Sequence, residues 1–237
     1  MANSYFAFKQ FVVKQERTAM KVGTDGVLLG VVTAVKESDK HVLDIGTGTG
    51  LVALMMAQRL PSAKVMGIEI DEESAFQAEE NCSESPFADR VRVERISLQE
   101  YKSDHPYDLI VCNPPFYNGT LTCPDDKRTM ARHALSLTFH ELAFFSSRLL
   151  TSEGRLTVII PTYAEHEMTE ACGENGLFLC RRVSIFPTPE KPVKRLVLEY
   201  SMRQRQTCDE MSLVIEYSRG EWSSEFRALV KDFYLKV

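Results

Sequence analysis

The sequence predicts an α/β fold, with a mostly parallel sheet covered by helices on both faces. From residue 41 onward, short apolar runs alternate with longer helical patterns, as in successive strand–helix units. The run at 107–112 is mostly apolar, which is typical of a strand buried on both faces of a parallel sheet. With 237 residues, 44% of them hydrophobic, the chain can bury a full core. We expect a single domain over residues 1–237, with residues 1–38 as a short N-terminal extension.

The elements can be assigned in order along the chain. Loose alternation over 4–15 predicts a short strand or hairpin, and Thr24 and Asp25 are candidate caps for a helix from Gly26 to Val35. Strands are expected at 41–45, 64–70, 90–96, 107–112, 154–160, 179–187 and 194–202. Further helices are expected at 50–60, 72–82, 136–150, 162–174 and 222–234.

Glycine and proline predict where several elements end. Glu153 and Gly154 suggest a helix stop followed by a return strand, which Pro161 then ends. The segment between the last two strands holds too many prolines for a crossover helix. We therefore expect those two strands to pair antiparallel.

Composition excludes several classes of protein. No apolar run reaches the ~18 residues of a membrane-spanning helix, and the N-terminus lacks the pattern of a secretory signal. The six cysteines form no CxxC pair, which argues against a metal site and favours reduced thiols in the cytoplasm. A net charge of -5 gives no global signal for nucleic acid, so any such partner must be held by local basic patches.

A glycine-rich turn follows the strand expected at 41–45. Gly46, Gly48 and Gly50 lie between the strand ending at Ile45 and a predicted helix. Glycines let the backbone turn sharply and approach a ligand at a helix N-terminus. The spacing is GxGxG, because position 51 is leucine, whereas dinucleotide sites prefer GxGxxG. This spacing disfavours a dehydrogenase.

An acidic residue ends the next strand. The carboxylate of Glu69 can accept hydrogen bonds from both hydroxyls of a ribose. Together with the glycine turn and the lack of a phosphate-binding lysine, it favours S-adenosylmethionine as the cofactor. The alternative is an ordinary tight turn followed by the solvated acidic start of a helix.

The motif Asn113-Pro114-Pro115-Phe116 ends the buried strand at 107–112. Two prolines cannot continue a central strand, because each lacks an N–H and fixes φ. An amide and an aromatic ring are therefore expected at the carboxyl edge of the sheet, where open α/β folds bind ligands. The alternative for Asn113 is a turn-forming asparagine.

These motifs resemble a known family. The pattern LDIGTGTG, GIEID and DLIVCNPPF is similar to Rossmann-like class I methyltransferases that methylate amino groups. The block MKVGTDGVLLG at 20–30 resembles the N-terminal signature of the bacterial tRNA1(Val) adenine N6-methyltransferases, and the closing Phe-Tyr-Leu is also similar. The resemblance covers essentially the full chain. It implies a seven-stranded, mostly parallel sheet with the last strand pair antiparallel, and an N-terminal extension over the cofactor.

The resemblance implies a catalytic set and a substrate. Asn113 and the carbonyl of Pro114 would accept hydrogen bonds from an adenine amino group, and Phe116 would stack on the flipped base. The substrate would be tRNA at position 37, beside the anticodon. A protein-glutamine N5-methyltransferase shares the motif, but that group carries a helical N-terminal domain. A DNA methyltransferase would need a target-recognition domain, and a non-catalytic binding module would not need the intact motif.

The resemblance also implies cofactor contacts. Asp25 would face the cofactor's ammonium group or cap the next helix, and Asp44 would bond either the glycine turn or the cofactor's amino-acid end. Ser97 stands where many members have aspartate, so a backbone N–H of Leu98 could serve instead. The full expected set is Lys21, Thr24, Asp25, Asp44, Gly46, Gly48, Gly50, Glu69, Ser97, Leu98 and Asn113.

The segment after the motif is expected to contact substrate. Residues 118–135 form a long, loop-like stretch whose second half is basic, and loops of that length are usually functional or disordered. Arg128 and Arg132 would contact tRNA phosphates, as would His133 rather than acting as a general base. Tyr117 would bind substrate or face solvent. No membrane or metal partner is expected.

Overall fold

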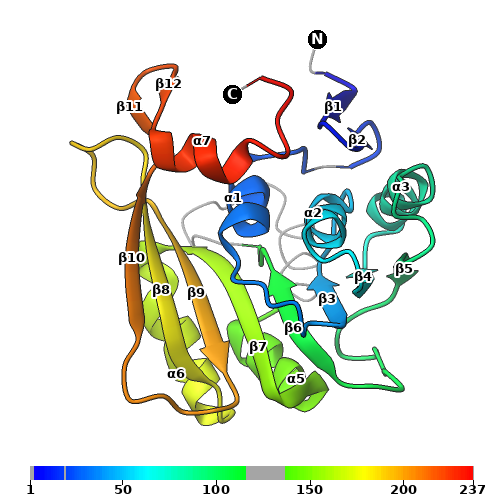
Figure 1. Cartoon of the computed structure of the whole chain (residues 1–237). Coiled ribbons are helices and arrows are strands. Elements are labelled where there is room, and N and C mark those ends of the chain that lie inside the picture. The colour runs from blue at the N-terminus through cyan, green and yellow to red at the C-terminus, as the bar shows by residue number, and fades with distance from the viewer. Residues whose placement is uncertain (1–2, 19, 116–136, 237) are drawn as a thin grey trace, which may run out of the picture.

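The computed structural model describes residues 3–18, 20–115 and 137–236. Its centre is a sheet with the strand order β10-β8-β9-β7-β6-β3-β4-β5 (Figure 1). The strands are β3 (His41–Ile45), β4 (Lys64–Glu69), β5 (Val91–Arg95), β6 (Tyr107–Cys112), β7 (Leu150–Pro161), β8 (Phe178–Phe186), β9 (Arg195–Ser201) and β10 (Asp209–Val214).

The seven predicted strands are confirmed, and so is the antiparallel final pair. Strand β9 runs antiparallel to both β7 and β8, while every other pairing in this sheet is parallel. The predicted count was wrong by one, because β10 adds an eighth strand to the edge beside β8. Only Leu213 of β10 is buried. A mostly exposed edge strand has no apolar run to reveal it in the sequence.

Helices cover both faces of the sheet (Figure 1). Neighbouring residues of a strand point to opposite faces, so Val42 joins one apolar cluster and Leu43 the other. The first cluster includes side chains from α1, α2 and α7, and the second includes side chains from α5 and α6. The helices are α1 (Thr24–Val32), α2 (Leu51–Arg59), α3 (Glu72–Ser83), α5 (Phe139–Leu149), α6 (Glu165–Glu174) and α7 (Ser224–Val230), with a 3-10 turn η1 (Thr162–Ala164).

The two ends of the chain meet on the α1 side. The predicted N-terminal hairpin is present as β1 (Tyr5–Ala7) and β2 (Val12–Lys14), and a second hairpin joins β11 (Glu216–Ser218) to β12 (Glu221–Trp222). Phe8 pairs with Tyr234 beyond α7, which brings the two termini together (Figure 1).

Two local predictions were wrong. Gly23, rather than Thr24 or Asp25, is the N-cap of α1, with no side-chain cap, and α1 ends at Val32. Gly154 does not end a helix, because α5 stops at Leu149 and Gly154 lies inside β7, where the pairing with β6 shifts. Pro161 does end β7, as predicted.

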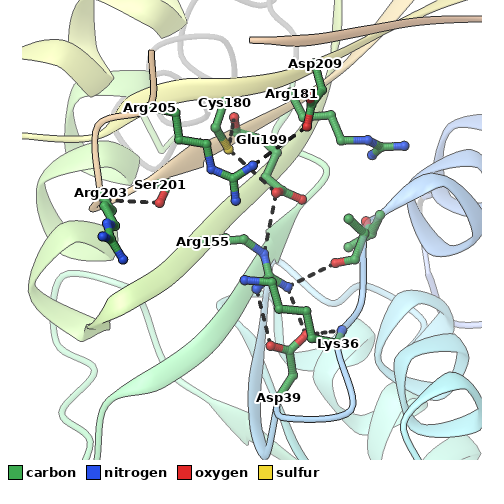
Figure 2. Close-up of polar contacts among 12 residues, drawn as sticks. Lys36, Asp39, Arg155, Cys180, Arg181, Glu199, Ser201, Arg203, Arg205 and Asp209 are labelled. Carbon is green, nitrogen blue, oxygen red and sulfur yellow. Dashed lines mark hydrogen bonds and ion pairs between the residues drawn. The ribbon is translucent and has the colours of Figure 1, made fainter. Parts of the chain in front are cut away.

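A buried ionic cluster fixes the connection between α1 and β3 (Figure 2). Arg155 of β7 is 1% exposed, and its guanidinium donates to Asp39 Oδ2 at 2.9 Å and to the carbonyl of Ala34 at 3.1 Å. Its Nε lies 3.5 Å from Glu199 Oε1 on β9. Removing one partner of such a buried pair costs about 3–5 kcal/mol, because a charge is left uncompensated. The cluster therefore holds α1 against the middle of the sheet.

Gly154 gives a test of the β6–β7 packing. A Cβ at this position would lie 2.9 Å from the carbonyl oxygens of Thr151 and Tyr107. Backbone carbonyls cannot shift away from the added methyl group as the end of a flexible side chain could. Gly154→Ala should therefore lower the free energy of unfolding, measured by urea titration, by about 1–3 kcal/mol. The control is Gly173→Ala in α6, where a Cβ meets nothing within 4 Å and where alanine should be neutral or stabilising. Equal stability of Gly154→Ala and the parent chain would contradict this account.

Candidate active site

Three predicted features, the glycine turn, Glu69 and Asn113, come together at the carboxyl edge of the sheet. Strand β3 lies between β4 and β6, and Ile45 is in register with both Ile68 and Cys112. The residues that end these parallel strands are therefore neighbours. This pairing places the glycine turn between Glu69 and Asn113, although the two are far apart in the sequence.

The glycine turn needs its glycines. Gly46, Gly48 and Gly50 have φ of 68°, 58° and 80°, a left-handed region that other residues rarely adopt. The backbone N–H groups of Gly46 and Thr47 donate to the carbonyl of Ile68 at 2.9 and 3.0 Å, which ties the turn to β4. No described residue lies within 4 Å of where a Cβ on Gly46 or Gly48 would be, so none of them crowds the backbone there.

Glu69 is held by this turn. Its Oε2 accepts from the N–H of Gly48 at 2.9 Å, and its Oε1 accepts from the N–H of Asp71 at 3.0 Å. Asp71 itself caps α3 by accepting from the N–H of Ser74 at 2.9 Å. Both oxygens of Glu69 are thus fixed in direction while the side chain keeps part of its exposure, an arrangement suited to receiving ligand hydroxyls.

Asp44 lies beneath the turn. It is 2% exposed, and its Oδ2 accepts from the Thr47 hydroxyl at 2.6 Å and from the N–H of Ala53 at 3.0 Å. Burial raises the pKa of Asp44 to about 7. The two hydrogen bonds lower this pKa, and the negative charge of Glu69 raises it further, but burial is the largest effect. Asp44 was expected to bond either the glycine turn or the amino-acid end of the cofactor. The structure contains the first of these bonds, from the hydroxyl of Thr47.

Two hollows meet at this edge. The first has a volume of about 570 Å³ and the second about 500 Å³. They share six lining residues: Met20, Gly46, Gly48, Asn113, Pro114 and Pro115. The two hollows therefore form one cleft that passes between the glycine turn and the Asn-Pro-Pro turn.

Asn113 carries an unsatisfied acceptor at this junction. Its Oδ1 is buried and has no hydrogen-bond partner among the described residues. Buried polar atoms are nearly always paired, and leaving one unpaired costs about 1–3 kcal/mol. This acceptor lies where the two hollows meet.

The second hollow is an apolar slot with polar ends. Glu69 and Ser97 line it together with apolar side chains that the sequence reading did not assign: Ile70, Ile96 and Leu137, besides the expected Leu98. Ile70 is 47% exposed although it directly follows a buried strand. An apolar residue beside Glu69, at the end of that strand, was the sequence feature that could have predicted this wall of the hollow. The Ser97 hydroxyl donates to Glu100 at 3.0 Å. The slot suits a flat ring next to a sugar.

The first hollow is lined by residues near the N-terminus and by residues between 185 and 216. Lys21, Thr24 and Asp25 form one wall, as expected for the N-terminal block. The opposite wall was missed by the sequence reading: Ile185, Pro187, Lys194, Arg195, Ile215 and Glu216. Arg195 Nε donates to Asp25 Oδ2 at 2.8 Å and joins the walls. Nothing in the local sequence marks these residues, since only the parallel pairing of β8 and β10 and the reversal of β9 bring them to this edge.

Some expected residues are not in the cleft as described. Gly50 lines neither hollow and packs against α3, where a Cβ would lie 3.5 Å from Ala78 and 3.2 Å from the sulfur of Cys82. Phe116, Tyr117, Arg128, Arg132 and His133 lie outside the described residues.

The described ranges contain neither a metal-binding cluster nor a membrane-spanning helix. Within residues 3–18, 20–115 and 137–236, no His, Cys, Asp and Glu side chains gather as a metal site would require. No helix in those ranges has the length and apolarity needed to span a membrane.

The fold has many solved relatives. A predicted O-methyltransferase from Agrobacterium tumefaciens matches with a TM-score of 0.68 and 20% identity, covering 88% of this chain and 96% of that one. A ribosomal protein L11 methylase from Lactobacillus delbrueckii subsp. bulgaricus matches with a TM-score of 0.56 and 20% identity, covering 81% and 84% of the two chains. These matches confirm the class I methyltransferase fold.

Sequence relatives give the family. The family described as "Methyltransferase small domain" matches residues 22–171. The proteins named "tRNA1(Val) (adenine(37)-N6)-methyltransferase" from Parabacteroides distasonis and Bacteroides thetaiotaomicron are 44% and 42% identical, each over 100% of both chains. That from Flavobacterium psychrophilum is 42% identical over 98% of this chain and 100% of its own length. The chain belongs to the tRNA1(Val) (adenine(37)-N6)-methyltransferase family, within the class I methyltransferases that use S-adenosylmethionine.

Proposed function

We propose that this chain transfers a methyl group from S-adenosylmethionine to the exocyclic N6 amine of adenine 37 in tRNA1(Val), the substrate in its relatives' name. The observation that carries the proposal is the buried, unpaired Oδ1 of Asn113 at the junction of the two hollows. An adenine amine has two N–H donors, and this atom is an acceptor that lacks a partner among the described residues.

Methyl transfer to an adenine amine needs no general base before the attack. S-adenosylmethionine, when bound, supplies a methyl group on a positively charged sulfur. Asn113 Oδ1 and the carbonyl of Pro114 would hold the amine hydrogens and favour the positive charge that builds on nitrogen. Fixing the amine in this way removes much of the entropic barrier, and such positioning is worth about 7–11 kcal/mol. The methylated nitrogen then loses a proton, so no side-chain base is needed beforehand.

The cofactor residues divide between the two hollows. Glu69 would accept from the ribose hydroxyls, and the apolar slot beside it would hold the adenine ring, with Ser97 and the N–H of Leu98 at its edge. Gly46 and Gly48 would let the backbone approach the cofactor closely. Lys21 and Thr24 would lie over its amino-acid end, as would Asp25. The open surroundings of Gly46 and Gly48 support a close approach there.

We infer that the acceptor side is completed by residues beyond Pro115. Phe116 would stack on the flipped base, Tyr117 would lie beside it, and Arg128, Arg132 and His133 would contact tRNA phosphates. We also infer one domain over the whole chain, with residues 1–38 over the cofactor, and a cytoplasmic location, where tRNA is modified.

A transfer assay separates this function from its rival. Labelled S-adenosylmethionine is offered with bulk tRNA, DNA and a release-factor peptide in separate reactions, and label should appear in the tRNA alone. Label confined to the peptide would instead indicate a protein-glutamine N5-methyltransferase, which the relatives do not favour.

Asn113→Ala should abolish most of the transfer. Loss of one acceptor aimed at developing charge costs about 100–1000-fold in kcat. The affinity for S-adenosylhomocysteine should change little by comparison. Asn175→Ala, at the C-terminus of α6, is the control and should keep the parent rate. Near-parent transfer by Asn113→Ala would argue against the role given to Asn113.

Glu69→Ala should weaken cofactor binding. Charge-assisted hydrogen bonds contribute about 1.5–3 kcal/mol, so calorimetry should show roughly a 10–100-fold rise in the Kd of S-adenosylhomocysteine. Glu72→Ala is a matched control, because Glu72 begins α3 close by and its carboxylate pairs with Arg95 on the surface at 3.0 Å. An unchanged Kd in Glu69→Ala would refute the ribose contact.

A further inference from the structure

An exposed aromatic ring lies just beyond the end of β7. That strand ends at Pro161, and Tyr163 follows it in the 3-10 turn η1. Tyr163 is 60% exposed, more than any other phenylalanine, tyrosine or tryptophan that the structure describes. Within those residues its ring has no stacking partner and its hydroxyl has no hydrogen-bond partner. Tyr163 lines neither hollow, so its ring is open to a partner outside the cofactor cleft.

The turn between β8 and β9, residues 187–194, lies beside this ring. The antiparallel pairing of β7 with β9 sets Pro161 opposite Arg195. Residues that follow Pro161 and residues that precede Arg195 therefore leave the sheet at the same edge. Val193 of the turn packs against the apolar cluster that contains Ala164 of η1, which keeps the two segments together. Figure 1 shows the turn extending past the end of the sheet.

The conformation of this turn is held by its own backbone. The N–H of Lys194 donates to the carbonyl of Ile185 at 2.9 Å, and the N–H of Lys191 donates to the carbonyl of Thr188 at 3.2 Å. Prolines at positions 187, 189 and 192 further restrict φ. Because the turn is already ordered, little conformational entropy is lost when a partner binds to it.

The turn presents two lysines to solvent. Lys191 and Lys194 are both exposed. Within the described ranges neither ammonium group has an ion pair or a hydrogen bond, and neither pairs with Glu190 of the turn or Glu216 of the same wall. Lys194 also lines the first hollow together with Asn113. One of the two cations therefore lies in the hollow that contains the proposed acceptor of the adenine amine.

We propose that Tyr163 and the 187–194 turn bind the single-stranded nucleotides beside the target adenine, with Tyr163 stacked on a neighbouring base and Lys191 and Lys194 on the phosphates. The inference rests on the proposed function and adds these described residues to its acceptor side. Single-stranded RNA is held by aromatic rings that stack on bases and by cations along the backbone. Taking the adenine out of its stack leaves a neighbouring base without a partner, and the Tyr163 ring replaces that partner. Local cations also explain how a chain of net charge -5 holds a polyanion.

RNA affinity tests this inference directly. The probe is a labelled anticodon stem–loop of tRNA1(Val), titrated by fluorescence anisotropy with the full chain saturated with S-adenosylhomocysteine. Tyr163→Ala should raise the Kd by about 5–150-fold, whereas Tyr163→Phe, which keeps the ring, should stay within about twofold of the parent. Lys194→Ala should weaken binding and reduce the slope of log K against log salt by about 0.7, the share of one phosphate contact. The Kd of S-adenosylhomocysteine should not change in these variants.

RNAs that lack one base show whether Tyr163 stacks. The base on the 5′ side or the 3′ side of the target adenine is removed in turn, leaving an abasic nucleotide. One of these two RNAs should bind the parent chain and Tyr163→Ala with equal affinity, because its stacking partner is already missing. A loss in Tyr163→Ala that persists with both abasic RNAs would overturn the inference.

Two residues elsewhere on the surface provide matched controls. Met211 on the edge strand β10 is 53% exposed, and Lys64 is an exposed lysine at the start of β4, at the opposite edge of the sheet. Met211→Ala and Lys64→Ala should bind the RNA as the parent does. Parent-like affinity in both Tyr163→Ala and Lys194→Ala, in a chain that still methylates tRNA, would overturn this inference and leave the proposed function intact. A parent chain that methylates no tRNA would remove the proposed function, and this inference with it.

Discussion

The whole site depends on the parallel pairing of β3 with β4 on one side and β6 on the other. A shift by one residue would move every side chain of β3 from one face of the sheet to the other, so the register is fixed by the two apolar clusters on those faces. The same register makes Glu69, the glycine turn and Asn113 neighbours. Packing on the faces of the sheet therefore decides the geometry of the cleft at its carboxyl edge.

The two ends of α1 have different roles. At its C-terminal connection, a buried cluster ties α1 to the sheet (Figure 2): Arg155 on β7 pairs with Asp39, just before β3, and with Glu199 on β9. The opposite end of α1 lines the first hollow with Asp25. A helix held firmly at its C-terminal connection can present its first turn to a ligand without a side-chain cap. Stability is thus supplied away from the cleft, which leaves the first turn of α1 available for binding.

The sequence predicted those site residues whose position depends only on the local pattern of strands and turns. Gly46, Glu69 and Asn113 each sit at the end of an apolar strand, and parallel strands bring such ends together whatever their separation. Arg195 and Ile215 could not be found in this way, because their place depends on β9 reversing and β10 adding to the edge. The cap of α1 and the place of Gly154 were misread for a related reason. A residue type permits several local roles, and the tertiary pairing selects one of them.

The cleft also holds groups that lower stability. The pKa of Asp44 is raised above its unfolded value, so the folded chain binds the proton more tightly than the unfolded chain does. Its ionised form therefore opposes folding, with no effect below about pH 4 and an effect that grows as the pH rises to about 7. The Oδ1 of Asn113, which has no hydrogen-bond partner within the described ranges, is a second such group. Both flank the glycine turn at the carboxyl edge of the sheet. A ligand that donates to Asn113 Oδ1 would offset the cost of leaving that atom unpaired, whereas Asp44 already accepts two hydrogen bonds from the chain.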